Sequence, residues 1–185
     1  MCIGISGFIH RTRGVLVSTE SNSHTVLWKI FFPGIKDDKP VELRNHVKFE
    51  LRPTGVLTNL HDWEYHTDED ETPDWYDEDD WREKAIKIGT QILSCWVKDG
   101  CKSSLDLRGG EKLTSLGNLE NVGGSLDLRD CKNLTSLGNL ENVGDSLDLC
   151  GCENLTSLGN LESVRETFYS DDTLIPEEQF KQVNS

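Results

Sequence analysis

The sequence is short of basic residues and of long apolar runs. Its 185 residues contain 19 Lys and Arg against 33 Asp and Glu, which gives a formal net charge of −14. Contacts to phosphate depend on clustered Lys and Arg, so this deficit disfavours nucleic acid as a direct ligand. No apolar run approaches the roughly 18 residues of a membrane span. The N-terminal stretch lacks a basic region followed by an apolar one, so we expect no secretory signal and a cytoplasmic protein.

Recognisable catalytic motifs are also missing. The sequence contains no G-x-S-x-G, Walker, H-E-x-x-H or G-x-G-x-x-G pattern. His61 and His66 lie among carboxylates, but loop carboxylates seldom converge on a metal without a ligand frame. Cys150 and Cys152 could form half of a metal site, but no second Cys or His pair stands at ligand spacing. We therefore expect no catalysis, no metal, no cofactor, and cysteines that are reduced and structural.

Three near-identical copies of a 21-residue unit fill residues 104–166. The first copy reads SLDLRGGEKLTSLGNLENVGG. A fixed period of this length is typical of chains in which each unit buries its apolar face against its neighbours. In each unit the later apolar residues are spaced by three, and a glycine such as Gly117 falls between them. This spacing predicts a tight extended or 3₁₀-like arc rather than an α-helix.

The spacing resembles the bacterial type of leucine-rich repeat. The pattern L-x-L-x-x-C occurs twice, at Leu126, Leu128 and Cys131 and again at Leu147, Leu149 and Cys152. It matches part of the frame L-x-x-L-x-L-x-x-N/C-x-L. The first copy departs from the frame, because Gly110 stands where Asn or Cys is expected. The resemblance implies a short leucine-rich-repeat solenoid of about three repeats with a C-terminal cap, over residues 101–185.

Side-chain alternation places a polar row on the outside of these repeats. Leucines point inward from each strand, so the Ser, Asp and Arg positions point outward. Stacked copies would align Asp106, Asp127 and Asp148 in one row, with Arg108 and Arg129 in the next row to offset the like charges. Such a row is either an ordinary solvated face or a binding surface.

Residues 1–100 predict an α+β head that precedes the repeats. Segments rich in β-branched and aromatic residues, or alternating in polarity, predict strands over residues 15–18, 25–32, 47–51 and 56–60. Apolar residues at helical spacing predict an amphipathic helix over about residues 78–97. The expected fold class is therefore an α+β head domain followed by a short leucine-rich-repeat solenoid.

Negative charge is concentrated in residues 62–80, the acidic segment. It holds eleven carboxylates and no Lys or Arg, so the remaining chain has 22 acids and 19 bases, a net charge of −3. Trp63, Trp75 and Tyr76 are interleaved with the acids. Acids in the first turn of the predicted helix complement its dipole, which gives some of them a structural reason.

Charge and aromatic anchors favour a binding protein that occludes a basic surface of a partner. In charge and size the chain is similar to phage or plasmid inhibitors such as DNA-mimic anti-restriction and anti-CRISPR proteins. One alternative is a bacterial leucine-rich effector or immunity protein that binds through its concave face. Another is an enzyme with its site in the head. The candidate partner-binding residues are Asp62, Glu64, Asp68, Glu69, Asp70, Glu71, Trp75, Tyr76, Asp106, Asp127 and Asp148.

Overall fold

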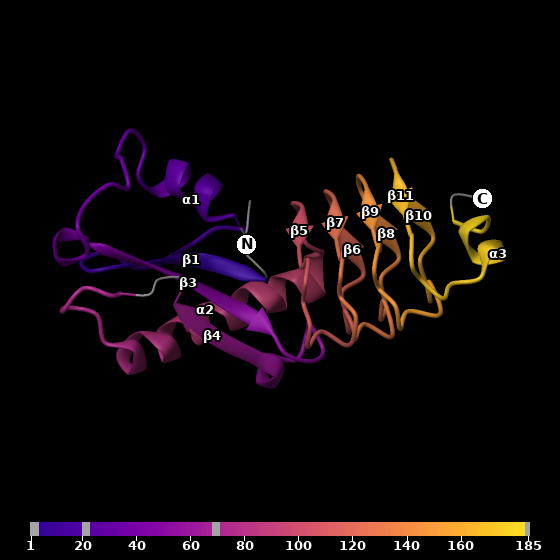
Figure 1. Ribbon diagram of the computed structural model, residues 1–185, viewed down its shortest axis with the longest axis horizontal. Helices are drawn as coiled ribbons and strands as arrows, with labels where there is room; N and C mark the ends of the chain where they lie inside the picture. Colours follow the sequence, from indigo (N-terminus) through magenta and orange to yellow (C-terminus); the bar gives the residue numbers. More distant parts are fainter. Residues whose placement is uncertain (1–3, 20–22, 68–70, 184–185) are drawn as a thin grey trace.

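The computed structural model describes residues 4–19, 23–67 and 71–183. In these ranges it contains three α-helices, one four-stranded antiparallel sheet and two parallel sheets, placed along one long axis (Figure 1). The N-terminal elements are β1 (Ile5–His10), β2 (Gly14–Val17), α1 (His24–Phe31), η1 (Val41–Leu43), β3 (His46–Pro53), η2 (Leu60–Asp62), β4 (Trp63–Thr67) and α2 (Glu78–Asp99). They are followed by β5 (Leu105–Asp106), β6 (Asn121–Val122), β7 (Leu126–Asp127), β8 (Asn142–Val143), β9 (Leu147–Asp148), β10 (Ser163–Val164), β11 (Phe168–Tyr169) and α3 (Glu177–Phe180).

The antiparallel sheet, in the order β2-β1-β3-β4, has a helix on each face (Figure 1). Alternation along β1 sends Phe8 to one face, where it packs with Leu27 and Phe32 around α1. Its neighbour Ile9 points to the other face and joins the core that contains Trp96 of α2. The sheet is therefore buried on both sides, which explains the long apolar content of β1 and β3.

Two of the expected strands are wrong. The segment expected as a strand over residues 25–32 forms α1, whose buried residues His24 and Leu27 are three apart. Residues 56–60 do not form the hairpin partner of β3; the strand that pairs with β3 is β4, a few residues later. The expected strands over residues 15–18 and 47–51 are confirmed as β2 and β3, and the expected helix as α2.

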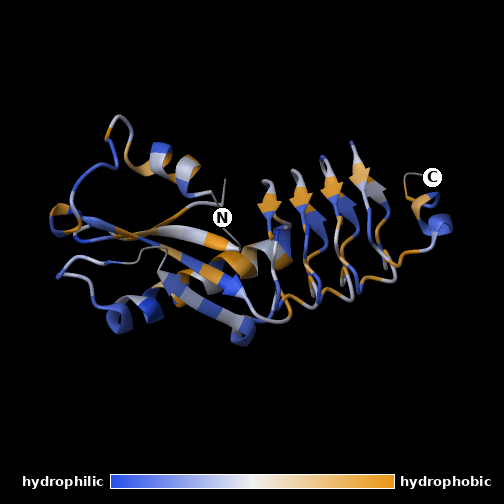
Figure 2. Ribbon diagram, viewed as in Figure 1, coloured by the Kyte–Doolittle hydropathy of each residue, from blue (hydrophilic) through white to orange (hydrophobic). Residues whose placement is uncertain are grey.

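The repeat copies stack through parallel pairing with a 21-residue offset. Leu105 lies opposite Leu126, and Leu126 opposite Leu147, in the sheet β11-β9-β7-β5. A second parallel sheet, β10-β8-β6, pairs Val122 with Val143 and the latter with the next copy. Figure 2 shows the same hydrophobic and hydrophilic segments recurring from copy to copy.

The expected fold class, an α+β head followed by a leucine-rich-repeat solenoid, is wrong. The chain is a small α/β fold in which two parallel sheets stand beside the antiparallel one. In the leucine-rich frame each unit has one strand and a helix or 3₁₀ turn. Here each copy has two short parallel strands, and no helix forms in residues 101–166, all of which are described. The segment with leucines spaced by three changes the direction of the chain without forming a helix. The second strand of each copy can therefore pair with the second strand of the next copy.

The larger of the two hydrophobic clusters formed by the described residues runs through both parts of the molecule. It begins with Ile5 in β1, passes through Trp96 in α2 and Leu105 in the first copy, and ends at Val183. Cys101, directly after α2, pairs in parallel with Val122, as its position one period earlier predicts. The end of α2 at residue 99 therefore does not interrupt the core.

The last copy is covered by the C-terminal segment. β11 adds one more strand after the third copy, and α3 follows it. The Gln179 side chain accepts a hydrogen bond from the Leu158 N–H at 2.9 Å, and Phe180 packs on Phe168 with ring centroids 5.2 Å apart. Among the described residues, no helix combines the length and apolarity needed to cross a bilayer.

Candidate functional site

The predicted aspartate row forms as expected. Asp106 lies opposite Asp127, and Asp127 opposite Asp148, across the paired strands β5, β7 and β9. Each aspartate Oδ1 also accepts a hydrogen bond from the backbone N–H two residues later, at 3.1 or 3.2 Å. The aspartates thus close the turn that ends each strand, which is a structural task.

Arginines neutralise most of this row. The Arg108 guanidinium donates to both oxygens of Asp106, at 3.0 and 2.7 Å, and its Nε lies 3.1 Å from Oδ2 of Asp127. Arg129 repeats the arrangement with Asp127 and lies 3.4 Å from Asp148. These hydrogen bonds to the carboxylates raise the pKa of both arginines. Three negative and two positive groups alternate, so the row presents little unpaired charge.

Several acids of the acidic segment also have structural partners. Asp62 Oδ2 accepts hydrogen bonds from Val56 N–H and the Asn59 amide, both at 3.0 Å, and closes the turn after β3. Asp77 caps α2 by accepting from the N–H groups of the next turn at 3.0 and 3.3 Å. Arg82 pairs with the first-turn acids of the same helix.

Glu64 connects β4 to the first repeat copy. Its two oxygens lie 2.9 and 3.1 Å from Lys112 Nζ, and this hydrogen bond lowers the pKa of Glu64. Glu71 is exposed. The remaining candidate acids of this segment, Asp68, Glu69 and Asp70, lie outside the described residues.

The aromatic residues of the acidic segment are anchored to the N-terminal sheet. Trp75 is half-buried and its Nε1–H donates to the Arg44 carbonyl oxygen at 2.8 Å. The Tyr76 and Tyr65 hydroxyl oxygens lie 2.7 Å apart. Burial and this hydrogen bond raise the pKa of Tyr65. These side chains hold the segment in place, so the structure does not present them as free anchors for a partner.

A second row of carboxylates is formed by Glu120, Glu141 and Glu162, here called the glutamate row. The Glu141 N–H donates to the Glu120 carbonyl and the Glu162 N–H to the Glu141 carbonyl, both at 2.8 Å, so the three residues stack directly. Glu120 and Glu162 are exposed and Glu141 is half-buried. Within the described residues, none of the three side chains has an ion-pair or hydrogen-bond partner. Sequence reasoning missed this row, although the same glutamate recurs at one position of every copy without an arginine two residues away.

A ladder of side-chain hydrogen bonds runs beside the glutamate row. The Asn142 amide donates to Asn121 Oδ1 at 2.9 Å, and the Ser163 hydroxyl donates to Asn142 Oδ1 at 2.8 Å. These bonds run along the residues that directly follow each glutamate. The glutamates therefore lie next to an ordered polar ladder.

No metal centre emerges from the same residues. In residues 4–19, 23–67 and 71–183, no group of three or more His, Cys, Asp or Glu is arranged to hold a metal ion. His66 lies 3.5 Å from Glu64, and His61 is exposed on η2. The chain matches no protein-family model, no curated protein and no solved structure.

Proposed function

We propose that the protein is a non-enzymatic binding protein that docks on a basic surface of a partner protein through the glutamate row. The observation that carries the proposal is the stacking of Glu120, Glu141 and Glu162 with no counter-charge among the described residues. Like charges directly opposite each other on neighbouring strands repel. A cationic partner would relieve this repulsion, which the free protein leaves in place.

The spacing of the row suits a surface that otherwise binds nucleic acid. Neighbouring strands lie about 4.8 Å apart, so the row carries one negative charge per ~4.8 Å. One strand of B-DNA carries one charge per roughly 3.4 Å, which makes the row about 70% as dense. Nucleic-acid-binding proteins cluster Lys and Arg on such surfaces. Occupying one would block it, in the manner of DNA-mimic anti-restriction and anti-CRISPR inhibitors.

In both surfaces expected from the sequence, the aspartate row and the acidic segment, some carboxylates are already used within the fold. The aspartates of the other row are shared with Arg108 and Arg129. In the acidic segment Asp62, Glu64 and Asp77 already serve the fold. The glutamate row is favoured because all three of its carboxylates are unpaired within the described residues and stand at a regular spacing, and unpaired charge steers association.

The test begins with affinity capture from a bacterial lysate, quantified by mass spectrometry for wild type and two variants. The first variant is Glu120→Gln/Glu141→Gln/Glu162→Gln. The matched control is Glu71→Gln/Asp74→Asn/Asp80→Asn, which removes the same charge from exposed positions of the acidic segment. We expect the glutamate variant to lose the captured partner and the control to retain it.

Surface plasmon resonance against that partner then measures the association rate at several salt concentrations. Because exposed charges steer association and are screened beyond a Debye length of about 8 Å, the wild-type rate should fall as salt rises. The glutamate variant should associate about tenfold more slowly at physiological salt. If instead the control variant alone loses binding, the acidic segment is the binding site and the assignment to the glutamate row is wrong.

A further inference from the structure

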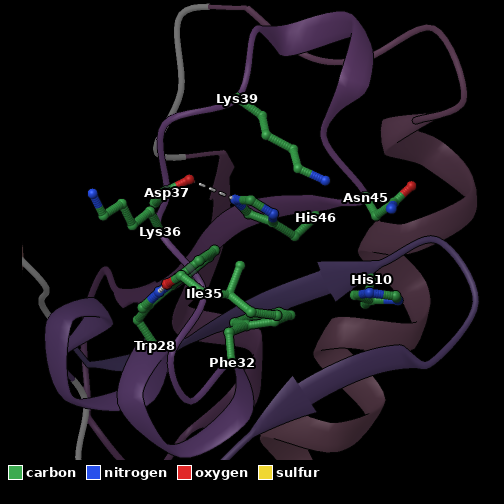
Figure 3. Close-up of a pocket in the computed structure, with 9 residues that line it drawn as sticks. All are labelled: His10, Trp28, Phe32, Ile35, Lys36, Asp37, Lys39, Asn45 and His46. Atoms are coloured by element: carbon green, nitrogen blue, oxygen red, sulfur yellow. Dashed lines mark hydrogen bonds and ion pairs between the residues drawn. The ribbon is translucent and has the colours of Figure 1, made fainter.

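A small pocket opens between α1 and the strand β3 in the N-terminal part. It has a volume of about 90 Å³ (Figure 3). Its lining comes from β1, α1, the loop that follows α1, and the start of β3: His10, Trp28, Phe32, Ile35, Lys36, Asp37, Lys39, Asn45 and His46. Nothing in the proposed binding function uses this pocket.

Apolar side chains make up the floor of the pocket. Trp28 and Phe32 pack at 4.4 Å between ring centroids, and the Trp28 Nε1–H is already bonded to the Ile35 carbonyl at 2.7 Å. The Ile35 side chain is 55% exposed at the mouth. A ligand therefore meets a preformed apolar surface, which is the usual character of small-molecule sites.

The histidines at the edge are held in fixed, neutral forms. His10 Nδ1 accepts hydrogen bonds from the N–H groups of Thr12 and Arg13, both at 3.2 Å, which assigns its proton to Nε2. Burial and the nearby Arg13 charge lower the pKa of His10. His46, whose side chain is nine-tenths buried, lies with Nε2 3.0 Å from Asp37 Oδ1, and burial lowers its pKa. His10 Nε2–H is thus a donor for a ligand.

Positive charge is in excess around the mouth. Asp37 is the one acid among the lining residues, and it is paired with Lys48 Nζ at 2.9 Å as well as with His46. Burial alone would raise the pKa of Asp37, but Lys48 and His46 hold it below its usual value. Lys36 and Lys39 have no carboxylate partner among the described residues, and the Lys39 ammonium is drawn reaching toward His46 and Asn45 (Figure 3).

We infer that this pocket binds a small carboxylate with a short apolar body. Lys39, the Asn45 amide and His10 Nε2–H would hold the carboxylate oxygens, while Trp28, Phe32 and Ile35 cover the carbon chain. Charge-assisted hydrogen bonds of this kind are the stronger ones. A cavity of about 90 Å³ has room for several waters, which suits an acid of about four carbons.

The test is a titration of the full chain with butyrate, monitored by two-dimensional NMR. We expect saturable shifts of the Trp28 indole N–H and of the His10 and His46 ring signals. Two comparison ligands separate the contributions of charge and of apolar contact to binding. 1-Butanol lacks the charge, and inorganic phosphate lacks the apolar body. Both should bind at least about tenfold more weakly than butyrate.

Variants with matched controls complete the experiment. Lys39→Gln should weaken butyrate binding about tenfold, and the exposed Lys87→Gln on α2 should leave it unchanged. Ile35→Glu places a negative charge at the mouth and should abolish binding, whereas Leu43→Glu, at a 65% exposed position outside the pocket, should not. Butanol or phosphate binding as tightly as butyrate would overturn the inference. So would shifts that do not saturate, or that persist in Ile35→Glu.

Discussion

At the residue scale, Cys131 and Cys152 occupy equivalent buried positions in successive copies. Each thiol donates to a carbonyl of the preceding copy, Leu107 for the first and Leu128 for the second, at 3.1 Å. Replacing either with Ala removes a core atom and this bond, so the free energy of unfolding should fall by about 1 to 3 kcal/mol. Urea denaturation measures the change. Cys150→Ser, at a half-buried outer position, should differ from wild type by under about 0.5 kcal/mol; a loss equal to that of Cys131→Ala would contradict the burial argument.

The same two thiols predict a loss of stability at alkaline pH. Burial raises the pKa of Cys131 and of Cys152 from 9.0 to about 12. The folded state therefore keeps its protons where the unfolded chain has lost them, so stability is full below about pH 9 and falls as pH rises toward about 12. Thermal unfolding at successive pH values measures the slope. Cys131→Val/Cys152→Val should flatten it in that window, and a slope identical to that of wild type would contradict the prediction.

At the element scale, the turn between the sheets of each copy depends on glycine. Gly138 and Gly159 both have φ near +60°, a region that L-residues adopt at a cost of roughly 1 to 2 kcal/mol. A Cβ on Gly138 would also lie 2.2 Å from the Gly117 carbonyl of the preceding copy, whereas one on Gly159 would have its nearest neighbour at 3.6 Å. Gly138→Ala should therefore destabilise the protein by about 2 kcal/mol more than Gly159→Ala. Calorimetry measures the free energy of unfolding of both variants. Equal losses of stability would show that backbone strain, and not the contact with Gly117, determines the effect.

The spacing of apolar residues predicted some helices and strands correctly and failed to predict others. The helical spacing of apolar residues gave α2, and the 21-residue period gave the alignment of the aspartates. α1 was missed because its β-branched and aromatic content favours a strand, although His24, Leu27, Trp28 and Phe31 follow helical spacing. The second parallel sheet was missed because its strands end the run of apolar residues spaced by three, which predicts a tight arc and not a strand.

Sites were harder to predict than elements for a physical reason. The pocket draws His10, Trp28, Lys39 and His46 from separate elements, and only the packing of α1 on the sheet brings them together. No spacing of residues within one segment of the sequence predicts that these side chains lie close together. The glutamate row, in contrast, follows from the 21-residue period in the same way as the aspartate row, because Glu120, Glu141 and Glu162 occupy one position of every copy.

At the scale of the whole molecule, the N-terminal part and the repeats depend on each other. The core passes from Trp96 through Cys101 into Leu105 without interruption, and Val56 pairs with Ser115. Residues 101–185 expressed alone would expose the apolar end that α2 and the loop after β3 cover, so we expect them to be poorly folded. Circular dichroism on heating checks this against the full chain. A cooperative transition at the full-length melting temperature would contradict the prediction.

Because the copies stack in register, the length of the molecule depends on the number of copies. One further 21-residue copy would add a strand to each parallel sheet, extending the molecule by about 4.8 Å and the glutamate row by one charge. The cap formed by α3 contacts the last copy through Gln179 and Leu158, so it would move outward with the end of the stack. If the glutamate row binds a partner as proposed, gaining or losing a copy would match the length of the row to a longer or shorter basic surface. Duplication of one repeat would then change which partners the protein fits.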